Sequence, residues 1–294
     1  MPGSAPDRGA LFAIGGREAR SGDAAVLGHF VSLCGGPAAR LVVLTTASRD
    51  PQKRVREYRE AFRSLGVEQL SFFHQDRRGE AEDPALLAAV DRADGVFFAG
   101  GGQLKLVTTL GGTALESRLR ERHCAGLHLG GTSAGAAAMS AVMIARGQGR
   151  SSARLSSVRM SPGLGFLPRV IVDQHFRERD RFGRLLAAVL CNPSMLGFGL
   201  DEDTAFLLDP RDRVSVFGSG TLTIIDGSDL EESNVDRLPE DAPVAFAGMR
   251  MHVLSEGWSY DLAEGRVQAP ATEPVERRPV VETLARPRAQ GDQG

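Results

Sequence analysis

Short apolar runs alternate with amphipathic stretches along the first half of the chain. Apolar residues recur at helical spacing over residues 24–33, 52–65 and 84–93, and Thr113 and Glu116 have capping-box spacing before a further helix. Between these stretches lie short, mostly apolar runs that predict buried strands, at residues 10–14, 41–44, 70–74, 95–98 and 127–129. Strands that alternate with helices predict an α/β protein with a mostly parallel sheet and helices on both faces.

The pattern changes after about residue 195. Residues 214–216 and 222–224 flank Gly218-Ser219-Gly220, which predicts a β-hairpin, and residues 244–253 offer another strand. The pattern therefore indicates a single domain over residues 1–268. From residue 269 onward, several prolines lie among charged residues, and we expect a disordered C-terminal tail over residues 269–294.

Composition narrows the class of protein. The chain has 294 residues, 42% of them hydrophobic, and a net charge of −2, so charge gives no reason to expect a nucleic-acid or membrane partner. The three cysteines are dispersed, which argues against a disulfide framework or a zinc site. No apolar stretch reaches membrane-spanning length, and the N-terminus does not resemble a secretory signal. We expect a cytoplasmic protein.

One short segment suggests nucleophilic catalysis. Gly131-Thr132-Ser133-Ala134-Gly135 fits the pattern G-x-S-x-G between a predicted strand and a predicted helix, where the pattern is typical of a nucleophile elbow. Small neighbours let the chain turn sharply, so that the serine hydroxyl projects and the N–H of Ala134 faces a developing oxyanion. The alternative is a tight packing turn in which Ser133 only caps the helix.

A nucleophilic serine needs a base and an orienting acid. His175 ends an apolar run and follows the polar pair Asp173-Gln174, at a strand end where α/β proteins place functional groups. Glu202 lies in a similar position after another apolar run. The order Ser…His…Glu differs from the Ser…Asp…His order of α/β-hydrolases, so we expect a different family.

Several segments together resemble the serine peptidase family that contains cyanophycinase and the aspartyl dipeptidase peptidase E. The resemblance covers roughly residues 10–265, and the combined motifs are more specific than any one of them. The segments that carry it are Ala13-Ile14-Gly15-Gly16, Thr45-Thr46-Ala47-Ser48, Phe97-Phe98-Ala99-Gly100-Gly101-Gly102-Gln103, Gly130 to Ala136, Asp173-Gln174-His175-Phe176 with the arginines after it, and Leu200 to Ala205.

The resemblance implies a flavodoxin-like or class I glutamine amidotransferase-like fold and a Ser-His-Glu triad. Ser133 would be the nucleophile, His175 the base and Glu202 the acid that orients the imidazole. The oxyanion would be held by the N–H of Ala134 and one from Gly101 or Gly102. The family implies no metal and no organic cofactor, and it suggests a homodimer.

The resemblance also implies a substrate, cyanophycin, which is a poly-aspartate chain with arginine on each β-carboxyl, and the β-Asp-Arg dipeptide as product. On a helix expected to start near Glu178, Arg177, Arg181 and Arg184 would share one face, and Arg181 and Arg184 would bind substrate carboxylates. Asp173 or nearby carbonyl groups would hold guanidinium. The substrate-binding residues implied in this way are Gln103, Asp173, Gln174, Arg179, Arg181 and Arg184.

Two departures from the family pattern affect specificity. Gly102 stands where the family usually has aspartate, and residues 141–158, which include Ser151, contain no acid although the family tends to have one about twenty positions after the serine. Two alternatives stay open. One is an aspartyl dipeptidase of the peptidase E kind, and the other is a non-catalytic binding protein on the same scaffold.

Overall fold

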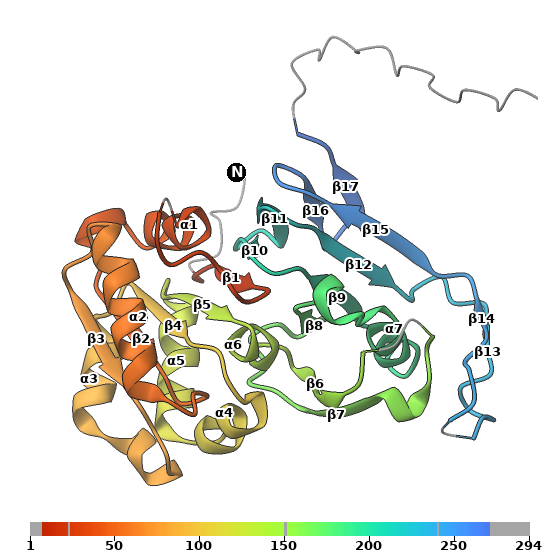
Figure 1. Ribbon diagram of the computed structural model, residues 1–294, viewed down its shortest axis with the longest axis horizontal. Helices are drawn as coiled ribbons and strands as arrows, with labels where there is room; N and C mark the ends of the chain where they lie inside the picture. Colours follow the sequence, from red (N-terminus) through yellow and green to blue (C-terminus); the bar gives the residue numbers. More distant parts are fainter. Residues whose placement is uncertain (1–7, 23, 150–151, 240, 271–294) are drawn as a thin grey trace, which may run out of the picture.

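The computed structural model describes residues 8–22, 24–149, 152–239 and 241–270. A mixed sheet of nine strands runs through it (Figure 1), in the order β17-β16-β11-β10-β1-β5-β4-β2-β3. The strands β1 to β5 run parallel to one another, and the others run antiparallel to their neighbours. The strands are β1 (Leu11–Ile14), β2 (Leu41–Leu44), β3 (Leu70–Phe73), β4 (Gly95–Phe98), β5 (His128–Thr132), β10 (Thr204–Leu208), β11 (Arg213–Gly218), β16 (Ser259–Asp261) and β17 (Arg266–Gln268).

Helices cover both faces of this sheet because successive strand residues point to opposite sides. Phe12 and Ile14 pack in one cluster with the apolar side chains of α1 and α2, whereas Leu11 and Ala13 pack in another with those of α3 to α6. The helices are α1 (Ala25–Leu33), α2 (Pro51–Ser64), α3 (Pro84–Arg92), α4 (Gln103–Leu110), α5 (Ala114–Cys124) and α6 (Ala134–Ala138).

A second sheet of four strands lies beside the first (Figure 1), in the order β15-β12-β9-β8. Helix α7 packs against β9 and β12 of this sheet, and its apolar side chains form a third core cluster. The additional elements are β8 (Val170–Gln174), β9 (Leu196–Leu200), β12 (Leu222–Asp226), β15 (Arg250–Leu254), α7 (Phe182–Leu190), the paired strands β6 (Val142–Gly147) and β7 (Val158–Pro162), and the short pair β13 (Glu232–Ser233) and β14 (Phe246–Ala247).

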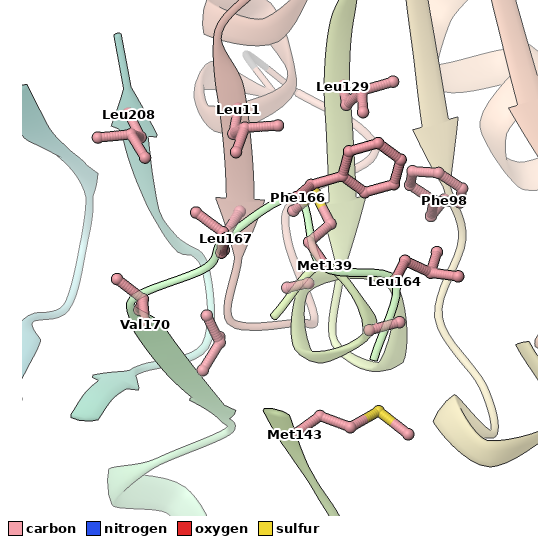
Figure 2. Close-up of a cluster of buried hydrophobic side chains, with 14 of the residues drawn as sticks. Leu11, Phe98, Leu129, Met139, Met143, Leu164, Phe166, Leu167, Val170 and Leu208 are labelled. Atoms are coloured by element: carbon pink, nitrogen blue, oxygen red, sulfur yellow. The ribbon is translucent and has the colours of Figure 1, made fainter. Parts of the chain in front are cut away.

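The two sheets share a core. Figure 2 shows Leu11 and Leu129 of the first sheet facing Met139 and Leu167, with Val170 of the second sheet beside them. These side chains are 0 to 3% exposed, and burying each stabilises the fold by roughly 1.5–3 kcal/mol. This packing fixes the carboxyl ends of β8 and β9 relative to that of β5.

The predicted C-terminal hairpin is wrong in its pairing. Strand β11 pairs with β10 and β16 in the first sheet, whereas β12 pairs with β9 and β15 in the second. Residues 218–220 therefore form a crossing between sheets, and a Cβ on Gly220 would lie 2.6 Å from Thr204 Oγ1. Antiparallel pairing of consecutive strands in this region occurs instead between β10 and β11 and between β16 and β17.

The predictions of the fold class and of the main sheet agree with the structure. The α/β class, the five parallel strands and the helices on both faces are confirmed. Among the described residues, no helix is long and apolar enough to cross a membrane. Most of the predicted tail, residues 271–294, lies outside the described residues.

Candidate active site

Ser133 stands directly after β5 and before α6. Its backbone has φ 51° and ψ −110°, a conformation that non-glycine residues rarely adopt and that is found at strained functional turns. Small neighbours make the turn possible. A Cβ on Gly131 would lie 2.7 Å from the Gly135 carbonyl carbon, and one on Gly135 would lie 2.3 Å from the Phe98 carbonyl oxygen. The turn leaves the Ser133 hydroxyl at the carboxyl end of the sheet.

His175 and Glu202 reach Ser133 from the second sheet. They follow β8 and β9, whose parallel pairing brings the two carboxyl ends together. The Ser133 hydroxyl oxygen lies 2.9 Å from His175 Nε2, and His175 Nδ1 lies 2.6 Å from Glu202 Oε1. The three side chains form one hydrogen-bonded chain, which can activate a serine for attack on a carbonyl carbon.

The environment of His175 favours the neutral imidazole. Burial lowers its pKa from the ordinary value and is the largest effect. The hydrogen bond with Glu202 opposes this shift, and the charge of Arg179 adds to it. A neutral imidazole at neutral pH can accept the Ser133 proton.

This shift predicts the acidic limb of the pH profile. The rate kcat/KM should fall as pH decreases through the His175 pKa, because protonation removes the base, and the midpoint should lie below 6.5. In Arg179→Gln, loss of a nearby positive charge should move this midpoint to higher pH. The midpoints are compared by measuring kcat/KM between pH 4 and 8, whatever the variant does to the absolute rate. An unchanged midpoint would contradict the electrostatic role of Arg179.

Gly16 forms the surface on which the His175 ring lies. Its φ is 106°, and a Cβ there would lie 2.4 Å from His175 Cε1 and 2.6 Å from Nε2. The neighbouring carbonyl of Gly15 accepts a hydrogen bond from the His175 N–H at 2.8 Å. The turn after β1 therefore determines where the imidazole sits.

Gly16→Ala is expected to lower kcat by about 100-fold, because the methyl group displaces the imidazole from Ser133 and small misplacements have effects of this size. Steady-state kinetics on the purified variant measures the loss. Gly22→Ala is the matched control, since that glycine also has positive φ, 75°, but has no atoms within 4 Å of the added Cβ. Equal losses in both variants would indicate backbone strain rather than displacement of His175.

The backbone N–H groups of Ala134, Gly101 and Gly102 were the candidates expected to bind the oxyanion, and they differ in whether they already donate a hydrogen bond. Ala134 is the first residue of α6, so its N–H has no intrahelical acceptor. The N–H of Gly102 donates to the Ala47 carbonyl at 2.8 Å and is unavailable. Gly101 has no hydrogen-bond acceptor for its N–H among the described residues, and a Cβ on it would lie 1.9 Å from the Ala47 oxygen. Ala134 and Gly101 are thus the better pair of donors.

The helix with three arginines on one face was predicted to start near Glu178, and this start is wrong. Residues Arg177–Arg179 form a single 3-10 turn, Asp180 has a φ of 48°, and α7 begins only at Phe182. Arg181 is the residue before the helix, and Phe182, the first residue of α7, is 37% exposed. Asp180 has a left-handed conformation, which a right-handed helix cannot contain, so the chain changes direction between the 3-10 turn and α7.

Asp173 binds guanidinium, but that of the protein itself. Its carboxylate is 1% exposed and lies 2.6 Å from Arg184 Nε and 3.3 Å from Arg181 Nη1. Arg184 also donates to the Gly147 carbonyl at 3.1 Å and is 4% exposed. This geometry gives Arg184 a positioning role through Asp173, in place of the direct substrate contact that the resemblance implies.

Arg181 links this buried pair to the site. It donates to Gln174 Oε1 at 2.7 Å, and burial lowers its pKa to about 10 although Asp173 opposes the shift. Gln103 donates to the Ile144 carbonyl at 3.0 Å. Both glutamine side chains are therefore held in place rather than free to rotate.

Several residues near the triad carry no signal in the sequence pattern. Glu18 is 4% exposed and accepts hydrogen bonds from Tyr58 and Thr132, both at 2.6 Å. Glu178 accepts a bond from the Glu202 N–H at 3.2 Å, and Arg17 Nε lies 3.4 Å from Glu202 Oε1. In the sequence, Glu18 follows a glycine turn and has the pattern of a solvated loop residue. Only the fold shows that it is buried and hydrogen-bonded.

A cavity of about 410 Å³ opens over Ser133 and His175. Gly100, Gly101, Gln103 and Gln174 line it. Positive charge dominates its wall, which is a setting for an anionic or zwitterionic ligand. The arginines that line it are Arg17, Arg20, Arg54, Arg179 and Arg181, and the one carboxylate among its lining residues is Glu18.

Gly102 leaves α4 without a side-chain cap at its N-terminus. The aspartate that the family usually has here would be an effective N-cap. Ser151, near which the family tends to have an acid, lies outside the described residues. Among the described residues, no group of three or more His, Cys, Asp or Glu side chains is placed to hold a metal ion.

Comparison with known proteins gives concordant matches. The model of peptidase family S51 matches residues 11–214. The cyanophycinase of Synechococcus elongatus is 37% identical over 262 residues, which cover 89% of this chain and 81% of that protein. The cyanophycinase of Geminocystis herdmanii (strain PCC 6308) is 36% identical over 255 residues, covering 86% of this chain and 94% of its own.

Solved structures share the fold at lower identity. The crystal structure of a peptidase from an acI-B1 Actinobacterium aligns with a TM-score of 0.65 at 23% identity, over 87% of this chain and 97% of that one. A putative peptidase E protein from Listeria monocytogenes EGD-e aligns with a TM-score of 0.50 at 15% identity, over 72% of this chain and all of its own.

Proposed function

The chain belongs to peptidase family S51 and is a serine-type peptidase, and we propose that it hydrolyses cyanophycin as an exopeptidase and releases β-Asp-Arg dipeptides. The observation that carries the proposal is the hydrogen-bonded chain Ser133–His175–Glu202 at the floor of an arginine-lined cavity. The identity of 36–37% with cyanophycinases over most of the chain supports the choice of substrate.

The proposed reaction proceeds through an acyl-enzyme. Ser133 Oγ attacks the scissile carbonyl carbon while His175 Nε2 takes the hydroxyl proton. The carbonyl oxygen becomes an oxyanion, which the N–H groups of Ala134 and Gly101 stabilise. His175 then gives its proton to the leaving amine, and the C–N bond breaks.

Water completes the cycle. It attacks the ester carbon of acylated Ser133, gives a proton to His175, and the second product leaves as a carboxylic acid while the hydroxyl regains its proton. Glu202 holds the imidazole in the tautomer with its proton on Nδ1 and stabilises the imidazolium that forms in each half.

The cavity supports binding of the carboxylates and the peptide groups of the substrate. Arg179 and Arg181 offer donors to carboxylates, while Gln103 and Gln174 can bond peptide groups of the substrate. Asp173 is already occupied by two guanidiniums, so the guanidinium of the substrate is expected to meet a different acceptor. We also propose a homodimer, which rests on the family resemblance and is tested by light scattering.

The alternative function is an aspartyl dipeptidase of the peptidase E kind. A single assay separates the two: purified protein is incubated with cyanophycin and, separately, with Asp-X dipeptides, and the products are identified by mass spectrometry. Release of β-Asp-Arg from the polymer is expected. Cleavage of the dipeptides alone would select the alternative, and cleavage of neither would refute both substrate assignments.

A further inference from the structure

Besides Arg179 and Arg181, a second pair of arginines, Arg20 and Arg54, lines the cavity over Ser133. Arg20 comes from the loop between β1 and α1, and Arg54 comes from the first turns of α2. Both line the cavity that holds Ser133 and His175. Their side chains are 26% and 33% exposed, respectively, so each guanidinium is mostly covered by protein but reaches the cavity.

One carboxylate holds the two guanidiniums side by side. Glu57 Oε2 accepts from Arg20 Nη1 at 2.9 Å and from Arg54 Nη1 at 2.7 Å. The same glutamate lies 3.8 Å from Lys53 Nζ. Arg20 also pairs with Glu18, so the three cations share two carboxylates and the cluster keeps an excess of one positive charge.

Arg20 is fixed more firmly than a surface arginine. Its Nε and Nη2 both donate to Glu18 Oε1 at 3.1 Å, and its guanidinium carbon lies 4.7 Å from the centre of the Tyr58 ring. Glu18 is in turn held by Tyr58 and by Thr132, the residue before the nucleophile. The position of this cation is therefore coupled to that of Ser133, and little entropy is lost when a ligand binds to it.

Arg54 keeps unused donors. Its Nη1 donates to Glu57, whereas its Nε and Nη2 have no hydrogen-bond acceptor among the described residues. Arg54 also borders a neighbouring cavity of about 400 Å³, which shares Gly100 and Gly101 with the first. A ligand that occupies the active-site cavity and extends along this wall must therefore pass the Arg54 guanidinium.

From these observations we propose that Arg20 and Arg54 form a carboxylate-binding subsite for the substrate of Ser133. The inference rests on the proposed function for the identity of the substrate. In cyanophycin the carboxylate can belong to the end of the aspartate chain or to an arginine side branch. A guanidinium pair with free N–H groups binds either by charge-assisted hydrogen bonds.

The test compares three ligands that differ in their carboxylates. The first is a synthetic peptide of two β-Asp-Arg units, the second is the same peptide with a C-terminal carboxamide, and the third carries agmatine in place of both arginines. Their dissociation constants are measured by calorimetry with Ser133→Ala protein, so that hydrolysis does not interfere. The variants, made in that background, are Arg54→Gln, Arg54→Lys and, as a control of equal charge change, Arg56→Gln, an exposed residue on the same helix.

We expect Arg54→Gln to weaken binding of the first peptide by about tenfold or more, since a hydrogen bond to a charged group contributes roughly 1.5–3 kcal/mol. Arg54→Lys should recover part of this loss, and Arg56→Gln should have no effect. The analogue that lacks the relevant carboxylate should bind wild-type and Arg54→Gln proteins equally, which identifies the source of the carboxylate. Equal weakening of all three ligands, or no weakening of any, would overturn the proposal.

A wrong substrate assignment can be distinguished from a wrong subsite assignment. If active protein cleaves Asp-X dipeptides but not the polymer, the substrate assignment is wrong while the subsite is still testable. The same variants are then compared on an Asp-X dipeptide and its carboxamide. A loss of affinity confined to the free acid supports the subsite, and equal affinities for Arg54→Gln and wild type refute it.

Discussion

Replacing Ser133 with alanine is expected to lower kcat for release of β-Asp-Arg by at least about 10⁴-fold, because it removes the hydroxyl that attacks the scissile carbonyl carbon in the proposed reaction. Among the described residues, the hydroxyl makes one hydrogen bond, to His175 Nε2 at 2.9 Å. The backbone turn is set by the surrounding glycines, so the variant should fold. The rate is measured as dipeptide released from purified cyanophycin.

Two controls make the result specific. Ser64→Ala removes a hydroxyl at the end of α2 that donates to the Ala61 carbonyl at 2.8 Å, and its activity should be unchanged. His175→Ala should cost about as much as Ser133→Ala, whereas Glu202→Gln should cost less, since orientation is one contribution and proton transfer is the whole function of the base. Retention of wild-type activity by Ser133→Ala would refute the nucleophile assignment.

Asp173→Ala is expected to destabilise the protein by about 3–5 kcal/mol, because it leaves the guanidiniums of Arg181 and Arg184 buried without their carboxylate. Both arginines are less than 10% exposed, and Asp173 is 1% exposed. The loss is measured as the change in free energy of unfolding in urea. Activity should fall as well, since Arg181 holds the Gln174 side chain at the cavity.

Asp236→Ala is the matched control for that loss. Asp236 pairs with Arg237 at 3.3 Å, but both side chains are about three-quarters exposed, and such pairs contribute roughly 0–1 kcal/mol. The double variant Asp173→Ala/Arg184→Met should be more stable than Asp173→Ala, because it removes one of the unpaired charges. A double variant no more stable than the single one would show that the loss comes from packing.

Much of the sheet could be predicted from the sequence because local signals agree with one another. The runs that became β1, β2 and β4 are apolar on both faces, as parallel strands covered by helices must be. Proline at the first position of α3 and Thr113 before α5 mark real helix starts. These features depend only on neighbours along the chain.

Pairing between distant segments could not be predicted in the same way. Strands β11 and β12 have the alternation and the glycine-rich connection of a hairpin, yet they enter different sheets. Alternation reports which face of a strand is buried but not which strand lies beside it. For the same reason, the position of Ser133 on one sheet and of His175 on another could not be predicted from local patterns.

Contacts between side chains at the site also could not be predicted from the sequence. An arginine-rich stretch looks like a solvated surface, and only the fold shows that Arg184 turns inward onto Asp173. Gly16 looked like an ordinary turn glycine, whereas its missing Cβ provides the space for the His175 ring. Arg20 and Arg54 are far apart in sequence and meet only through Glu57.

The most direct test of the triad is covalent labelling with a fluorophosphonate, which reacts with serines activated as nucleophiles. Intact-protein mass spectrometry should show one adduct, peptide mapping should place it on Ser133, and labelling should be lost in Ser133→Ala and slowed at least about 100-fold in His175→Ala. Labelling of a different residue that blocks hydrolysis, or equal labelling rates in wild type and His175→Ala, would contradict the account.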